Sequence, residues 1–151
     1  MKVVEATRMV NASPADVWAL VTDLEGSEQI ISGITRIERL DDGPGFGIGT
    51  RWRETRVLFG REAVEEMEVT AIEPERSYTV EADGRGAHYR SVLTVEPSGE
   101  GTVLSMTFGG EPIGLAARIM AATAGRLFEG ATRKAFERDL ADIAAAAESK
   151  G

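Results

Sequence analysis

Apolar and polar residues alternate with a period of two from about residue 34 to residue 109, which is the pattern of half-buried β-strands. Short breaks rich in Gly, Pro and Asp divide this stretch, so consecutive strands are expected to pair as antiparallel hairpins. A further strand is expected near the N-terminus, over residues 3–11. The strands predicted within the alternating stretch cover residues 34–41, 49–58, 61–72, 76–83, 87–96 and 102–109.

Two short helices are predicted between the first strand and the alternating stretch. Ser13 is a good N-cap and Pro14 fits the first helical position. Apolar residues then follow at helical spacing until Gly26, which is expected to end the first helix. Ser27 is expected to cap a second, shorter helix that runs to residue 31.

A helical period returns from residue 112 to about residue 147, which predicts a helix on the order of 50 Å long at about 1.5 Å per residue. Its apolar stripe consists of Phe128, Thr132, Phe136, Leu140, Ile143 and Ala147. The sheet and this helix need to bury their apolar faces, and each offers the other a partner. The sequence therefore predicts a single α+β domain over residues 1–151, in which a seven-stranded antiparallel sheet wraps around the C-terminal helix.

Composition narrows the classes of partner and location. The chain has 25 acidic and 17 basic residues and a net charge of −8, which disfavours nucleic acid as a partner. It has no cysteine, no export-signal pattern and no apolar run of the length that a membrane span needs, so we expect a cytoplasmic protein without stable membrane insertion. We expect a monomer or a homodimer, and no metal or cofactor.

The hairpin expected around Gly60 carries opposite charges on its two strands. The first strand has three arginines and the second has several glutamates, and pairing across the turn brings these rows together. Opposite charges facing each other across strands contribute roughly 0.2–1 kcal/mol per pair and oppose register slips. The charged residues concerned are Arg51, Arg53, Arg56, Glu62, Glu65, Glu66 and Glu68.

The order of the predicted elements, together with four short motifs, resembles a known superfamily. The motifs are ASPADVW at residues 12–18, GIGTRW at 47–52, EPER at 73–76, and VEP at 95–97 followed by Gly101-Thr102. This arrangement resembles the START-like, or SRPBCC, proteins and, among them, the polyketide cyclase/dehydrase-like branch. The resemblance covers nearly the whole chain. It implies a helix-grip fold with a cavity between the sheet and the long helix, and it implies no single activity.

Strand parity selects the residues that would face such a cavity. The resemblance suggests that Val95 and Trp52 face inward, and alternate residues of each strand share that face. The parity that turns Trp52 inward also turns Glu54 and Arg56 inward, where a charge is costly unless it is paired. We expect these two to pair with each other or with Glu66, or to lie at an open mouth. The expected cavity residues are Trp52, Glu54, Arg56, Tyr78, Val80, Tyr89, Ser91, Leu93, Met106, Phe108, Met120, Thr123 and Leu127.

Four glycines, Gly43, Gly45, Gly47 and Gly49, crowd one predicted loop. A dinucleotide-binding fingerprint would open a helix, whereas this run leads into a strand, and a phosphate-binding P-loop would need Gly-Lys-Ser/Thr. The run resembles the glycine-rich loop of the birch-pollen-allergen branch of the same superfamily. We consider two roles for it: a loop that gates the cavity, or a mobile connection between strands.

Two functions fit these observations. The first is a carrier or binding protein for a small hydrophobic or aromatic molecule. The second is an enzyme of the cyclase, dehydrase or isomerase kind that uses polar cavity residues. His88 is the only histidine, which excludes a metal site built on several histidines; we consider it as a surface residue, a group at the cavity mouth or a general base. The apolar residues among the expected cavity residues would also suit a filled core without a cavity.

Overall fold

The computed structural model describes residues 4–58, 60–84, 87–112 and 114–149, and the side chains of residues 58, 84, 112 and 116–129 lie outside that description. The chain forms seven strands and three helices in the order that the sequence predicts. Their bounds are β1 Val4–Val10, α1 Pro14–Val21, α2 Leu24–Ile30, β2 Ile34–Arg39, β3 Arg51–Leu58, β4 Arg61–Glu73, β5 Ser77–Gly84, β6 Ala87–Ser98, β7 Gly101–Pro112 and α3 Leu115–Ser149.

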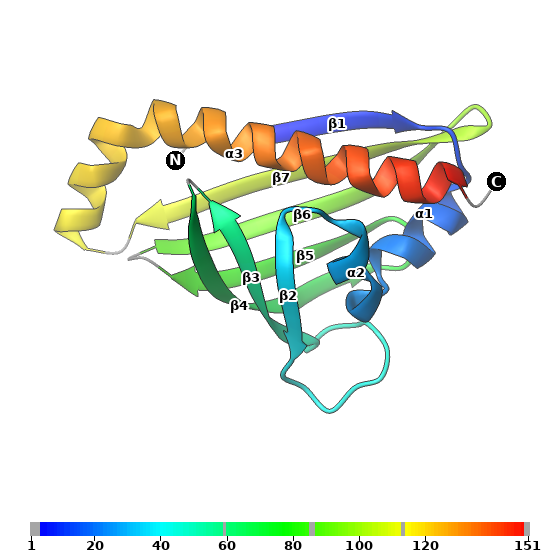
Figure 1. Ribbon diagram of the computed structural model, residues 1–151, viewed down its shortest axis with the longest axis horizontal. Helices are drawn as coiled ribbons and strands as arrows, with labels where there is room; N and C mark the ends of the chain where they lie inside the picture. The colour runs from blue at the N-terminus through cyan, green and yellow to red at the C-terminus, as the bar shows by residue number, and fades with distance from the viewer. Residues whose placement is uncertain (1–3, 59, 85–86, 113, 150–151) are drawn as a thin grey trace.

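All the strands join one antiparallel sheet in the order β1-β7-β6-β5-β4-β3-β2, which confirms the predicted seven-stranded α+β fold. Consecutive strands from β2 to β7 pair as neighbours, and β1 closes the far edge by pairing with β7. Figure 1 shows α3 lying across the sheet, with α1 and α2 at the end where α3 finishes. The strands β2 and β3 cross the view steeply relative to β5, β6 and β7, which reveals the strong twist of the sheet.

The junction between the two short helices differs from the prediction. The Ser13 hydroxyl accepts a hydrogen bond from the Asp16 N–H at 3.2 Å, so Ser13 caps α1 as expected. However, α1 ends at Val21, and the carboxylate of Asp23 caps α2 by accepting from the Gly26 N–H at 3.2 Å. A Cβ on residue 26 would collide with that carboxylate, so Gly26 does not end α1 but makes room for the cap of α2.

The C-terminal half of α3 is fixed against the rest of the protein. Leu140, Ile143 and Ala147 are buried among residues of β1, α1, β6 and β7. Asp142 accepts hydrogen bonds from both the N–H and the hydroxyl of Ser32, at 2.9 and 2.8 Å, which ties the helix to the segment between α2 and β2. These contacts set the position from which α3 projects side chains toward the sheet.

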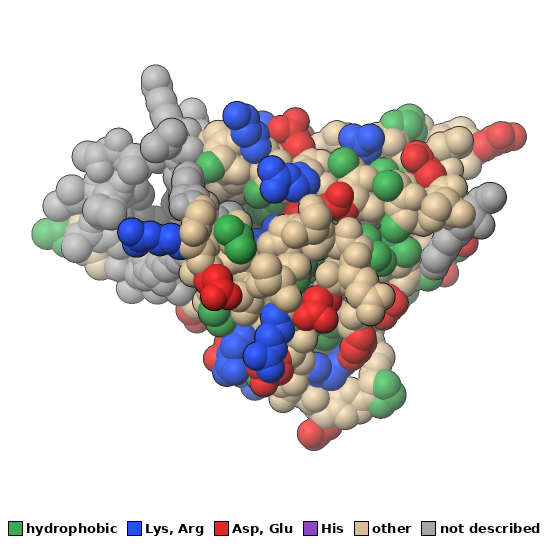
Figure 2. All heavy atoms as spheres, in the orientation of Figure 1, with side chains coloured by type: hydrophobic (Ala, Val, Ile, Leu, Met, Phe, Trp, Pro, Cys, Tyr) green, Lys and Arg blue, Asp and Glu red, His purple; other side chains and the backbone are tan. Residues whose placement is uncertain are grey.

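The charged rows predicted around Gly60 form only in part. Arg51 lies near Glu66 and Glu68, and Arg53 lies 3.2 Å from Glu66 and 3.6 Å from Glu38. Over β2 and β3, Figure 2 shows such basic and acidic side chains next to one another on the outer surface. Glu65 and Arg56 lie apart from these rows, because both belong to the inward parity of their strands and line the interior, as strand parity predicted for Arg56.

Candidate functional site

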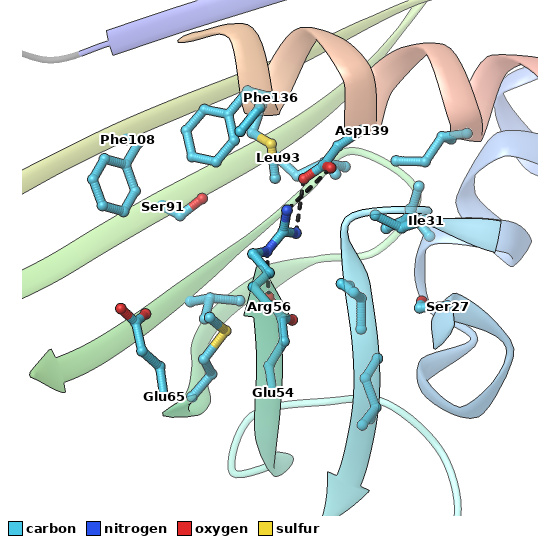
Figure 3. A pocket seen from close by; sticks show the side chains of 18 of the residues that line it. Ser27, Ile31, Glu54, Arg56, Glu65, Ser91, Leu93, Phe108, Phe136 and Asp139 are labelled. Carbon is cyan, nitrogen blue, oxygen red and sulfur yellow. Dashed lines mark hydrogen bonds and ion pairs between the residues drawn. The ribbon is translucent and has the colours of Figure 1, made fainter. Parts of the chain in front are cut away.

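A cavity of about 200 Å³ lies between the inner face of the sheet, α2 and the C-terminal half of α3 (Figure 3). All ten strand residues among the expected cavity residues line it: Trp52, Glu54, Arg56, Tyr78, Val80, Tyr89, Ser91, Leu93, Met106 and Phe108. The other three expected cavity residues, Met120, Thr123 and Leu127, belong to the stretch of α3 whose side chains lie outside the described residues. The described lining residues therefore enclose a void between the sheet and α3 and do not interlock completely.

Aromatic rings form much of the apolar wall. Phe46 lies 4.9 Å from Tyr78 and 6.5 Å from Trp52 between ring centroids, on the side of the cavity nearest the glycine-rich loop. On the other side, Phe108 stacks on Tyr89 at 5.3 Å and meets Phe136 of α3 edge-on at 5.4 Å. Rings packed against one another hold their positions, so the wall presents fixed flat surfaces to the void.

A buried polar cluster interrupts this apolar wall. Nη1 and Nη2 of Arg56 donate to the two carboxylate oxygens of Asp139, at 3.2 and 2.8 Å, and Nε donates to Glu54 at 2.9 Å. The second oxygen of Glu54 accepts from the indole N–H of Trp52 at 3.2 Å. Figure 3 shows Arg56 reaching from β3 between Glu54 and the helical Asp139. Of the partners expected for Glu54 and Arg56, the structure shows the pairing of these two with each other. Glu66 lies on the outer face, where it pairs with Arg53.

Burial and charge act against each other within this cluster. Asp139 is only 1% exposed, and this burial raises the pKa of its carboxyl above its usual range, although the Arg56 guanidinium opposes the shift. Burial alone would lower the pKa of Arg56, but the charges of Glu54 and Asp139 outweigh it, so its pKa is raised and the guanidinium stays charged. Burial, assisted by the same two carboxylates, also raises the pKa of the Tyr78 hydroxyl, which therefore stays protonated.

The sequence analysis missed Asp139, although a signal for it exists. Asp139 follows Phe136 by three residues and precedes Ile143 by four, so it lies on the apolar face of the helix. A charged residue on such a face needs a partner of opposite charge from the element opposite, and Arg56 supplies it. Gly33 completes the surroundings, because a Cβ there would lie 3.1 Å from Nη1 of Arg56. The contribution of α2 was not predicted either, although its Leu24, Ser27 and Ile30 line the cavity.

The glycine-rich loop between β2 and β3 is tied down at several points. Arg39 donates to Glu25 of α2 at 2.7 Å, to Asp41 at 3.1 Å and to the carbonyl oxygen of Gly45 at 2.8 Å. Gly45 and Gly49 have φ angles of +96° and +95°, a conformation that side chains other than glycine rarely adopt. This conformation of the loop backbone directs Phe46 inward, where it forms part of the cavity wall.

His88 lies on the opposite face of the sheet from the cavity. Its ring nitrogens lie 2.6 Å from a carboxylate oxygen of Asp83 and 2.8 Å from one of Glu81. These hydrogen bonds, that of Asp83 first, raise the pKa of the imidazole. This position matches a surface residue and excludes His88 as a cavity-mouth group or a general base within the cavity. The described residues contain no group of three or more acidic or histidine side chains that could hold a metal ion.

Comparisons with known proteins support this picture of the fold. The family model for "Polyketide cyclase / dehydrase and lipid transport" matches residues 1–148. No curated protein matches the sequence closely enough to serve as a relative. Among the described residues, no helix is both long and apolar enough to cross a membrane.

Several solved structures share the fold at low sequence identity. TTHA0849 from Thermus thermophilus is 22% identical with a TM-score of 0.79, and the match covers 99% of both chains. The Zhui aromatase/cyclase from Streptomyces sp. R1128 is 18% identical with a TM-score of 0.78, over 97% of this chain and 93% of that one. Truncated norcoclaurine synthase from Thalictrum flavum is 19% identical with a TM-score of 0.66, over 95% and 91%. With its helix-grip architecture and a family match over nearly its whole length, the chain belongs to the polyketide cyclase/dehydrase and lipid transport family of the START-like (SRPBCC) superfamily.

Proposed function

We propose that the protein binds a small hydrophobic or aromatic molecule in the cavity between the sheet and α3. The observation that carries this proposal is the void itself, which is walled by packed aromatic rings and carries the polar cluster of Glu54, Arg56 and Asp139. Ligand sites in proteins are typically apolar hollows with a few placed polar groups, of roughly 300–1,000 Å³. At about 200 Å³ the cavity is smaller than this range, which favours a ligand of one or two rings.

Filling the void should abolish this binding. We expect Ser91→Phe, which adds a ring between Val80 and Phe108 on the inner face, to weaken the affinity for a two-ring alcohol such as 2-naphthylmethanol at least about tenfold. Val92→Phe is the matched control, because the next residue of β6 faces the other side of the sheet and its ring leaves the void unchanged. Calorimetric titration of both variants measures the effect, and equal affinities in the two would contradict the proposal.

We propose in addition that the loop carrying Gly43, Gly45, Gly47 and Gly49 gates the cavity. It contributes Phe46 to the wall, and Arg39 holds it to α2 and to its own backbone. Arg39→Ala should therefore speed both association and dissociation of a bound aromatic compound severalfold while changing its affinity little. Stopped-flow fluorescence measures these rates; rates equal to those of the wild type would show that the loop is only a connection between strands.

A second candidate function is catalysis of the cyclase, dehydrase or isomerase kind. The observation that favours it is a cavity-lining carboxyl, Asp139, whose raised pKa brings it closer to the value that suits a general base near neutral pH. In such a reaction Asp139 would remove a proton from a carbon next to a carbonyl group, and Arg56 would stabilise the negative charge that develops on the carbonyl oxygen.

Deuterium uptake distinguishes the two functions. If the site catalyses proton removal, the protein should accelerate deuterium incorporation next to the carbonyl of an aromatic ketone such as acetophenone, and Asp139→Asn should remove the acceleration. Binding of the ketone without any acceleration of exchange by the wild type would leave the carrier as the better account. Proton NMR in heavy water measures both.

A further inference from the structure

The charge of the cavity indicates which ligands it accepts, provided that it binds ligands as proposed above. Three carboxylates, of Glu54, Glu65 and Asp139, and one guanidinium, of Arg56, are the charged groups among the described lining residues. Glu65 lies directly opposite Glu54 in the pairing of β3 with β4, on the same inner face. Within this mostly apolar wall, the carboxylates of Glu54 and Asp139 share the guanidinium of Arg56, so this cluster has two acidic groups for one basic group.

The guanidinium of Arg56 is already engaged by the protein. Three of its N–H groups donate to Glu54 and Asp139, and the contact with Asp139 is bidentate. A guanidinium recognises a carboxylate best through two parallel hydrogen bonds, and Asp139 occupies that geometry. To make the same two-bond contact, a ligand carboxylate would have to displace Asp139, which would leave that side chain, 1% exposed, as an unpaired buried charge.

Groups that donate hydrogen bonds meet no such obstacle. Each carboxylate oxygen of Glu54 and Asp139 accepts one described hydrogen bond and retains the capacity to accept another. An alcohol or amine on a ligand could donate to these oxygens without breaking any contact within the protein. A positive charge would in addition be attracted by the cluster, in which two carboxylates share one guanidinium.

We propose that the cavity selects aromatic ligands carrying a neutral or cationic hydrogen-bond donor, and that it rejects aromatic carboxylates. The cluster of Glu54, Arg56 and Asp139 is then a filter for ligand charge as well as a structural contact. The apolar wall supplies the affinity for rings, and the cluster supplies the discrimination between rings that differ only in their polar substituent.

Three compounds of nearly equal size test this proposal: 2-naphthylmethanol, 2-naphthylmethylamine and 2-naphthoate. At pH 7 we expect the alcohol and the amine to bind the wild-type protein, and the naphthoate to bind at least about tenfold more weakly than the alcohol. Asp139→Asn removes one carboxylate charge and the bidentate contact, so it should tighten naphthoate binding about tenfold and narrow the preference for the alcohol over the naphthoate. Asp142→Asn is the matched control, because it makes the same change one turn along α3 at a residue that pairs with Ser32 outside the cavity.

The outcomes separate this inference from the proposed function. Naphthoate binding as tight as that of the alcohol would overturn the charge filter while leaving an aromatic-binding cavity. Binding of none of the three would overturn the proposed function and the filter together. An equal gain of naphthoate affinity in Asp139→Asn and Asp142→Asn would show that overall charge, not the cavity cluster, governs discrimination. If Asp139→Asn does not fold, the relative affinities of the wild-type protein for the three compounds still test the charge filter.

Discussion

Replacing Arg56 with alanine should lower the free energy of unfolding by about 3–5 kcal/mol at pH 7, the usual cost of removing one partner from a buried ion pair. The change leaves two carboxylates, of Glu54 and Asp139, in the interior without their shared cation. Glu54 is 7% exposed and Asp139 is 1% exposed, so water cannot replace the lost partner. Urea denaturation followed by circular dichroism measures the loss.

The loss of stability in Arg56→Ala should become smaller as the pH falls. Without the guanidinium, burial raises the pKa of the Asp139 carboxyl in the folded variant above its pKa in the unfolded chain. Between the pKa in the folded variant and the pKa in the unfolded chain, the folded variant binds more protons than the unfolded chain. Its stability therefore rises as the pH is lowered through this range. The difference from the wild type should therefore be largest near neutral pH and smaller near pH 4.5, close to the ordinary carboxyl pKa values of about 4.

Arg53→Ala is the matched control for this prediction. Arg53 lies on the same strand with the opposite parity, and it pairs with Glu38 and Glu66 on the outer surface. An exposed pair of this kind typically contributes about 0–1 kcal/mol. A loss in Arg56→Ala no larger than that in Arg53→Ala would show that the interior cluster is solvated or that its contacts are not formed.

Trp52→Ala should cost about 3–5 kcal/mol, because Trp52 is 6% exposed and its removal enlarges the existing void. It also removes the indole N–H that donates to Glu54. Trp52→Phe keeps most of the buried ring area and loses only that hydrogen bond, so it should cost about 1–3 kcal/mol. Urea denaturation compares the two variants, and a loss in Trp52→Ala no larger than that in Trp52→Phe would contradict the burial of the ring.

The same residue should report ligand binding. Trp52 lines the cavity, whereas Trp18 of α1 packs edge-on against Tyr78 at 6.1 Å and is not part of the described lining. An aromatic ligand should therefore change the protein fluorescence mainly through Trp52, and Trp52→Phe should lose most of the change while Trp18→Phe keeps it. A signal that survives in Trp52→Phe would place the bound ligand away from the inner face of β3.

The sequence predicted the inner face of the sheet well because parity is a rigid consequence of strand geometry. Once Trp52 is placed inward, Glu54 and Arg56 must follow, and the antiparallel pairing carries the same face from strand to strand. The error at Glu65 shows the limit of using charge alone. The charged rows grouped the glutamates by charge without regard to parity, although Glu65 lies directly opposite the inward Glu54.

The contribution of the helices could not be predicted in the same way. Where α2 begins depends on the capping carboxylate of Asp23 and on the space that Gly26 leaves for it, whereas the sequence prediction took Ser27 as the cap. Helical spacing places Asp139 on the apolar face of α3, but spacing does not identify its partner, and only the contact with Arg56 reveals its role. Such contacts join residues 83 positions apart, which local patterns do not encode.

The most direct test of a ligand site between the sheet and α3 is a two-dimensional ¹H–¹⁵N NMR titration of the wild-type protein with 2-naphthylmethanol. We predict saturable chemical-shift changes in the backbone amides of Arg56, Val80, Ser91 and Asp139, which line the cavity from three strands and the helix. The outward-facing Arg53 and His88 should change little. Saturable changes that cluster at those outer residues, or no saturable change at any residue, would contradict the proposed site.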